Sequence, residues 1–239
     1  MRYLALCCDY DGTLAHHGNL DEPTIAALER LKQAGRKLVM VTGRELDELK
    51  TVCSRLDLFD RVVAENGALL YRPETGEEQL LGERPPNEFV AALRGKGIER
   101  ISVGRVIVAT WEPHETTVLE TIHEMGLELQ VIFNKGAVMI LPTGMNKATG
   151  LRVALKELNL SELNAVGVGD AENDHAFLSI CGCGVAVANA LESLKERADF
   201  VTKATHGAGV TELIDEMLEN DLANRKPAPR APQPAVGVT

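Results

Sequence analysis

The stretch YLALCCDYDGT, residues 3–13, joins a short apolar run to two aspartates and a glycine. The run Tyr3–Cys8 is apolar at successive positions, which is typical of a strand buried on both faces of a parallel sheet. Asp9 and Asp11 project to the same side of an extended chain because they are two residues apart. Gly12 lets the backbone turn away sharply. The stretch predicts a buried strand whose carboxyl end carries two carboxylates, although a plain turn also favours Asp and Gly.

Similar apolar runs recur along the chain and alternate with helical periodicity. The segments predicted as core strands are Tyr3–Cys8, Lys37–Thr42, Arg61–Glu65, Ala165–Gly169, Gly184–Ala188 and Asp199–Lys203. A helix is predicted to open at Asp21-Glu22-Pro23 and to stop at Gly35. Further helices are predicted over Glu45–Leu56, Ala148–Leu158, Asp174–Ile180, Leu191–Arg197 and Gly207–Glu219. This alternation predicts an α/β fold with a doubly wound, Rossmann-like, mostly parallel sheet.

The alternation changes between residues 83 and 142. This segment is predicted to hold two helices and two pairs of short strands, the last pair meeting at the turn Asn134-Lys135-Gly136. Hairpins do not belong inside a parallel sheet, so we interpret the segment as a small inserted α+β domain. The predicted organisation is a core of residues 1–82 and 143–222, the inserted domain 83–142, and a Pro-rich tail, 223–239, that is expected to be disordered.

Charge and composition exclude several classes of protein. The 239 residues carry a formal net charge of −10, which argues against polynucleotide binding. A small anionic substrate remains open, since a few cations and a metal ion can reverse the field locally. No stretch approaches the ~20 apolar residues that span a bilayer, and the N-terminus does not resemble a signal peptide. The five cysteines are interpreted as buried small residues or inert thiols, so we expect a cytoplasmic protein that binds neither nucleic acid nor membrane.

Three further polar clusters lie where predicted core strands end or core helices begin. Thr42-Gly43-Arg44 combines a hydroxyl with a free glycine amide at a helix N-terminus, which suits an anion, although Thr is also an ordinary N-cap. Lys147 immediately precedes the helix that returns from the insertion, although most lysines are simply solvated. Asp170, Asn173 and Asp174 follow another strand, where acids often cap a helix. In an open α/β sheet these clusters share the edge where ligands bind.

Together the clusters resemble the four motifs of the haloacid dehalogenase superfamily. Asp9-x-Asp11-Gly12-Thr13 resembles the first motif, while Thr42, Lys147 and Gly169-Asp170-x-x-Asn173-Asp174 match the second, third and fourth in order. An α/β cap inserted between the Thr and Lys motifs is similar to the subfamily of sugar-phosphate and phosphoglycolate phosphatases. Glu65-Asn66-Gly67-Ala68 also resembles that subfamily, whereas Ala208 stands where relatives often carry an acid.

The resemblance implies a phosphatase that depends on Mg²⁺ and passes through an aspartyl phosphate. Asp9 would be the nucleophile, and Asp11 would protonate the leaving group and then activate water. The Asp9 carboxylate, the Asp11 backbone carbonyl and Asp170 would hold the metal, since all three are hard oxygen ligands.

The resemblance also implies which groups bind the substrate. The groups that would hold phosphoryl oxygens are Thr42, Gly43, Lys147 and Asn173. Asp174 would act behind them, orienting Lys147 or a metal-bound water. Arg44 and Asn66 lie near the same predicted edge and are candidate substrate contacts.

The favoured substrate is a small phosphorylated metabolite, with a sugar phosphate ahead of phosphoglycolate. One alternative is a phosphomutase of sugar phosphates, which would return the phosphoryl group to a sugar. An alternative from another class is a phosphoacceptor signalling domain, which also places Asp, Thr and Lys on a doubly wound sheet but lacks a long insertion. A dehalogenase is disfavoured by Asp11, because a halide leaves without a proton.

Overall fold

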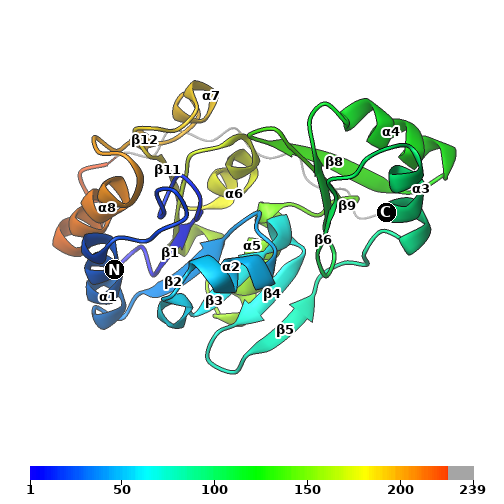
Figure 1. The fold of residues 1–239 in the computed structure, drawn as a ribbon. Helices are drawn as coiled ribbons and strands as arrows, with labels where there is room; N and C mark the ends of the chain where they lie inside the picture. The colour runs from blue at the N-terminus through cyan, green and yellow to red at the C-terminus, as the bar shows by residue number, and fades with distance from the viewer. Residues whose placement is uncertain (226–239) are drawn as a thin grey trace, which may run out of the picture.

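The computed structural model describes residues 1–225, which form two β-sheets with helices packed against them (Figure 1). The larger sheet has eight strands in the order β12-β11-β10-β1-β2-β3-β4-β5. Its parallel strands are β1 (Ala5–Cys8), β2 (Lys37–Val41), β3 (Arg61–Ala64), β10 (Ala165–Gly169), β11 (Cys183–Ala186) and β12 (Phe200–Val201). The predicted doubly wound α/β fold is therefore confirmed.

The central strand β1 is buried along its whole length between β10 and β2. The helices around the sheet are α1 (Glu22–Gln33), α2 (Leu46–Val52), α5 (Lys147–Glu157), α6 (His175–Ile180), α7 (Glu192–Lys195) and α8 (His206–Asn220). Helices α1 and α8 pack together on one face, while α5 and α6 pack together on the other (Figure 1). The chain crosses over from β1 to β2 on one side of the sheet centre and from β10 to β11 on the other, and the general preference for right-handed crossovers accounts for helices on both faces. Burial on both faces explains why β1 is apolar at successive positions.

The start of α1 agrees with its sequence signal. The Asp21 carboxylate accepts a hydrogen bond from the Thr24 N–H at 2.9 Å, and Pro23 lies in the first turn. Short 3-10 helices occur at η1 (Leu56–Leu58), η2 (Glu65–Gly67), η3 (Glu162–Asn164) and η4 (Glu172–Asp174).

The sequence argument that hairpins do not belong in the core sheet is wrong at one edge. Strands β4 (Leu69–Arg72) and β5 (Glu77–Leu80) continue the core sheet beyond β3 as an antiparallel hairpin. Strand β5 is exposed throughout, so it needs no second apolar face and carries no long apolar run. An exposed edge strand of this kind gives a much weaker sequence signal than a buried parallel one.

A second sheet lies beyond this hairpin, at the right of Figure 1. Its strands are β6 (Ser102–Val103), β7 (Val108–Trp111), β9 (Ala137–Pro142) and β8 (Leu129–Asn134), paired antiparallel in that order. Helices α3 (Asn87–Gly95) and α4 (Glu115–Glu124) accompany it, and Phe89, Val118 and Ile140 belong to an apolar cluster separate from that of the larger sheet. All of these elements fall within the predicted insertion, residues 83–142.

Several expectations concern features outside these sheets. All five cysteines are buried, and within residues 1–225 none of them is joined in a disulfide. Among residues 1–225, no helix is long and apolar enough to cross a membrane. The predicted disordered tail, residues 223–239, lies outside the described residues from position 226 onward.

Candidate active site

Three neighbouring strands of the core sheet end at the same place. Asp9 directly follows β1, Thr42 follows β2, and Asp170 follows β10. The Asp9 N–H donates to the Val168 carbonyl at 3.0 Å, so the chain is still held to its neighbour where the carboxylate emerges. The parallel register of these strands therefore brings residues far apart in sequence to one edge.

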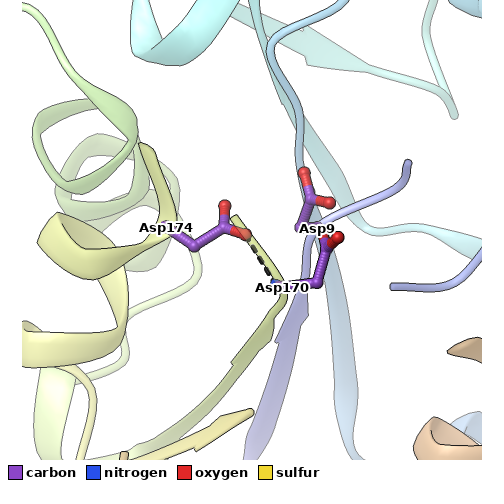
Figure 2. Close-up of side chains that lie close together, drawn as sticks. All are labelled: Asp9, Asp170 and Asp174. Atoms are coloured by element: carbon purple, nitrogen blue, oxygen red, sulfur yellow. Dashed lines mark hydrogen bonds between the residues drawn. The ribbon is translucent and has the colours of Figure 1, made fainter. Parts of the chain in front are cut away.

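Three aspartates form a buried cluster at this edge (Figure 2). One carboxylate oxygen from each of Asp9, Asp170 and Asp174 lies within 4.8 Å of the others. Asp174 Oδ2 accepts the N–H groups of Asp170 at 2.8 Å and Ala171 at 2.9 Å, so this oxygen holds the loop after β10. Asp9 and Asp170 come from adjacent strands, and in Figure 2 their carboxylates lie side by side.

Lys147 is a buried cation inside this cluster. Its Nζ donates to Asp9 Oδ1 and to Asp174 Oδ1, both at 2.6 Å. The Asn146 side chain caps α5 by accepting the N–H of Thr149 at 3.1 Å, which fixes the start of the helix and thus the position of Lys147. Burial works to lower the pKa of Lys147, but the two carboxylates outweigh it and raise that pKa above its ordinary value. Lys147 therefore carries its charge at neutral pH.

Two lysines face the three carboxylates, the buried Lys147 and the half-exposed Lys135 that pairs with Asp170, so the carboxylates outnumber the cations. Burial raises the pKa of Asp9 to about 8, with repulsion from Asp174 and Asp170 adding to it and Lys147 acting against it. Burial also raises the pKa of Asp170. A buried cluster of hard oxygen ligands with too little positive charge suits a divalent cation such as Mg²⁺. The donor set therefore fits the predicted metal.

Asp11 lies at the mouth of the site and is held by Arg44. Arg44 Nε donates to Asp11 Oδ2 at 2.6 Å and Arg44 Nη2 to Asp11 Oδ1 at 2.8 Å, a two-pronged ion pair. Arg44 also pairs with Glu48. Its guanidinium therefore positions Asp11. From the sequence, Arg44 was expected only as a candidate substrate contact, and its pairing with Asp11 was not anticipated.

The Thr42 motif folds tightly against the same edge. Thr42 is buried, and its Oγ1 accepts the N–H of Arg44 at 3.1 Å. A side chain at Gly43 would bring its Cβ to 3.1 Å from Met139 Cε and 3.5 Å from Asn173 Nδ2. Glycine thus leaves the space between the second sheet and the core open.

Asn173 and Asn66 meet behind that space. Asn173 Nδ2 donates to Asn66 Oδ1 at 3.0 Å, while Asn173 Oδ1 and Asn66 Nδ2 are buried without a partner among the described residues. Asn66 adopts the left-handed conformation in η2. The pair thus keeps spare hydrogen-bonding capacity beside the acidic cluster.

A cavity of about 260 Å³ separates the core edge from the second sheet. Its core wall is lined by Asp9, Asp11, Gly43, Arg44, Glu45, Glu48, Ala171 and Asn173. Its opposite wall is lined by Ser102, Ile107, Ala109, Trp111, Asn134, Ala137 and Met139. Of the residues named from the sequence for this site, Asp9, Asp11, Gly43, Arg44 and Asn173 line the cavity, whereas Lys147 and Asp174 support it from behind.

The sequence arguments for the site omitted Glu45, Glu48 and every residue on the wall of the second sheet except Trp111, whose ring could floor a sugar site but more often serves packing. Ala109 and Trp111 on β7, and Ala137 and Met139 on β9, alternate and so share one face of that sheet. This alternation is visible in the sequence, but which face meets the core depends on how the two sheets dock.

Comparisons with known proteins agree with this architecture. The sequence profile of the haloacid dehalogenase-like hydrolases matches residues 6–103 and 120–214. A phosphoglycolate phosphatase of Methanothermobacter thermautotrophicus is 32% identical over 219 residues, spanning 88% of this chain and 96% of its own. Phosphoglycolate phosphatase 2 of Saccharolobus solfataricus is 30% identical, spanning 92% and 94%. A haloacid dehalogenase-like hydrolase from Bacteroides thetaiotaomicron shares the fold, with a TM-score of 0.75 at 20% identity over 90% of this chain and 99% of that one.

Proposed function

The chain belongs to the haloacid dehalogenase-like hydrolase family and is a phosphatase, a phosphoric monoester hydrolase; from this premise we propose that it hydrolyses a small phosphorylated metabolite through an aspartyl phosphate on Asp9. The observation that carries the proposal is the environment of Asp9. Its carboxylate lines the cavity, lies 2.6 Å from Lys147 Nζ and is grouped with Asp170. Lys147, together with a metal ion on Asp170, would favour the ionised form of Asp9, which its attack on phosphorus requires.

Asp9 is proposed as the nucleophile and Asp11 as its proton-transfer partner. An Asp9 oxygen would attack phosphorus as the bond from phosphorus to the leaving oxygen breaks, and the Asp11 carboxyl would protonate that oxygen. The Asp11 carboxylate would then take a proton from water as the water attacks phosphorus, releasing inorganic phosphate and free Asp9. The position of Asp11 supports its proposed role in proton transfer. Asp11 lines the same cavity as Asp9, and two hydrogen bonds from Arg44 hold its carboxyl there.

Mg²⁺ is proposed as the cofactor. The Asp9 carboxylate, the Asp11 backbone carbonyl and Asp170 would hold it, and Asp174 would keep Lys147 and the loop after β10 in place. When bound, the metal would neutralise charge on the phosphoryl oxygens. Thr42, Gly43, Lys147 and Asn173 would bind the remaining phosphoryl oxygens.

The substrate is proposed to be small and polar, with a sugar phosphate favoured. A cavity of about 260 Å³ is below the usual range for drug-sized ligands, so it suits a compact metabolite. Glu45, Glu48 and Ser102 line it, and such groups hydrogen-bond hydroxyls more readily than they accept a carboxylate. Phosphoglycolate is the second candidate, favoured by the names of the relatives.

Residues 83–142 are proposed to form a cap that sets substrate selectivity. Their sheet supplies the wall of the cavity that faces Asp9, and they contain their own apolar cluster. Replacing the segment by a short linker should sacrifice discrimination among metabolites while simple aryl phosphates are still cleaved slowly. An unchanged preference ranking in the truncated protein would place selectivity in the core.

A panel of phosphorylated metabolites tests the proposed function. Purified protein with Mg²⁺ should release inorganic phosphate from at least one sugar phosphate or from phosphoglycolate, and chelation should abolish release until Mg²⁺ is restored. Product analysis separates a phosphatase from a phosphomutase, because a mutase yields an isomerised sugar phosphate instead of free phosphate. Full activity after exhaustive chelation would remove the metal from the proposal.

A further inference from the structure

A lysine from the second sheet reaches into the acidic cluster of the core. Lys135 lies in the turn between β8 and β9, where Lys135 and Gly136 both adopt positive φ angles, of 48° and 81°. Its Nζ donates to Asp170 Oδ2 at 2.7 Å and to the Asp11 carbonyl at 3.1 Å. This is the cation that pairs directly with Asp170. No motif in the sequence singled out this residue.

The space that receives the ammonium group depends on Gly12. Gly12 has a φ of +89°, and a Cβ there would lie 2.8 Å from Lys135 Nζ and 2.3 Å from Asp170 Oδ2. Any larger residue would therefore obstruct the contact. The Thr13 hydroxyl donates to the other oxygen, Asp170 Oδ1, at 3.1 Å, so Asp170 is held between the core and the hairpin tip.

The two oxygens that Lys135 contacts are also two of the ligands assigned to Mg²⁺ above. A divalent cation bound to Asp170 and to the Asp11 carbonyl would sit close to the ammonium group, and two like charges at such a distance repel. Lys147 donates hydrogen bonds to Asp9 and Asp174, and Arg44 forms an ion pair with Asp11. Lys135 is thus the cation that a metal ion bound to Asp170 would displace.

We propose that Lys135 and a divalent metal ion compete for Asp170 and the Asp11 carbonyl, so that metal binding releases the β8–β9 hairpin tip from the core. The inference rests on the metal assignment in the proposed function. It also links metal loading to the shape of the cavity, because Asn134, next to Lys135, lines the wall that faces Asp9. Lys135 acts here as a positioning residue that couples the two sheets.

Direct titration of metal tests the competition. Isothermal titration calorimetry with Mg²⁺ in phosphate-free buffer should show tighter binding to Lys135→Met than to the wild type, by about fivefold, because the competing cation is gone. The matched control is Lys96→Met, which removes a lysine paired with Glu124 at 2.5 Å in the same region but away from the cluster. Lys96→Met should bind Mg²⁺ as the wild type does.

Limited trypsin digestion supplies a second readout that does not depend on catalysis. Mg²⁺ should speed cleavage after Lys135 severalfold, as the tip leaves the core, and should leave cleavage after Lys96 unchanged. Equal or weaker Mg²⁺ binding by Lys135→Met overturns the competition even when the wild type is an active, Mg²⁺-dependent phosphatase. Absence of Mg²⁺ binding to the wild type overturns the metal assignment itself and the competition with it. Protection of the Lys135 site by Mg²⁺ likewise overturns the proposed release.

Discussion

The two walls of the cavity differ in how their residues are held. On the core wall, Asp9 and Asp11 each have a cationic partner, Lys147 or Arg44, at 2.8 Å or less. On the wall from the second sheet, Ala109, Trp111, Ala137 and Met139 present a mainly apolar face. Ion pairs therefore hold the residues of the core wall in place, whereas the wall from the second sheet offers a substrate mainly apolar contact and a defined shape.

This difference indicates a division of work between the two sheets. Buried charges interact strongly and must be placed accurately, so they suit the chemical step, which takes place at a fixed point. Apolar contacts are weaker individually and follow the outline of whatever they enclose. This division predicts that changes to Asp9, Asp11 and their cationic partners impair every substrate, whereas changes in the second sheet alter the ranking of substrates.

The largest effect is expected from Asp9→Asn. The amide keeps the shape of the side chain but cannot act as the nucleophile, so phosphate release should fall by at least about 10³-fold with every ester. Phosphate release across a substrate panel measures this loss. Asp57→Asn, at an exposed core aspartate that makes a surface ion pair with Arg55, is the matched control and should keep wild-type turnover. Near-wild-type turnover by Asp9→Asn on any substrate would assign the nucleophile elsewhere.

Asp11→Asn should separate the two halves of the reaction. It keeps Asp9 but loses the group that protonates a poor leaving group and activates water. With p-nitrophenyl phosphate, whose leaving group hardly needs a proton, rapid-quench kinetics should show about one equivalent of p-nitrophenol and then a stall. With a sugar phosphate the burst should shrink or vanish. A burst in Asp9→Asn and none in Asp11→Asn would reverse the two roles.

Stability of the metal-free protein should depend on pH through Asp9. Its folded-state pKa of about 8 lies above the ordinary value near 4, so the folded state holds this proton more tightly than the unfolded state does. The resulting stability is fully present below about pH 4 and is lost as pH rises through 8.

Urea denaturation in the presence of a chelator measures this effect. Between pH 6 and pH 8, the wild type should lose about 2 kcal/mol more than Asp9→Asn, in which the titrating group is absent. The difference between the two proteins cancels the contributions of other groups. Parallel curves for the two proteins would mean that Asp9 is already ionised in the metal-free fold.

The core of this molecule was largely predictable because its signals are local. One apolar run is followed by Asp9-x-Asp11 and another by Asp170. Each run predicts a buried strand and the carboxylates at its carboxyl end. Parallel pairing of β1 with β10 then brings the two strand ends together without further information. The contact of Lys147 with Asp9 and Asp174 follows from where α5 begins.

Features that depend on docking between segments were not predictable in this way. The β4–β5 hairpin lies at an exposed edge, where little apolar periodicity is required. Lys135 was visible only as a turn residue, since its contact with Asp170 depends on the placement of one sheet against the other. Arg44 was expected near the substrate, and its pairing with Asp11 depends on side-chain directions that the sequence does not specify.

Glu65→Gln tests the difference between the two cavity walls at the junction of the two sheets. The buried Glu65 carboxylate accepts three backbone N–H groups, from Arg105 at 2.9 Å, Val106 at 2.7 Å and Ile107 at 2.9 Å. Glutamine offers one acceptor oxygen and turns an NH₂ group toward these donors, which should cost about 2 kcal/mol of stability. Thermal or urea denaturation measures this loss.

The same variant should affect discrimination more than chemistry. With the second sheet less firmly held, kcat/KM should fall further for the preferred metabolite than for p-nitrophenyl phosphate. Glu88→Gln, at an exposed position of α3, is the control and should change neither stability nor selectivity. Equal losses on both substrates would show that the second sheet also supports the chemical step.

The smallest effect is expected from Trp111→Leu, on the wall from the second sheet. The Trp111 ring lines the cavity and stacks against Arg100, whose Cζ lies 3.4 Å from the ring centroid. Loss of the ring removes apolar contact from the part of the substrate beyond the phosphoryl group, so KM for the preferred metabolite should rise about tenfold. Because the ring lies across the cavity from the Asp9–Lys147 pair, kcat should change by less than about threefold. Leu119→Ala, at an exposed apolar position of α4, should leave both constants unchanged. A fall in kcat with an unchanged KM would contradict the division between the two walls, since it would make Trp111 part of the chemical step.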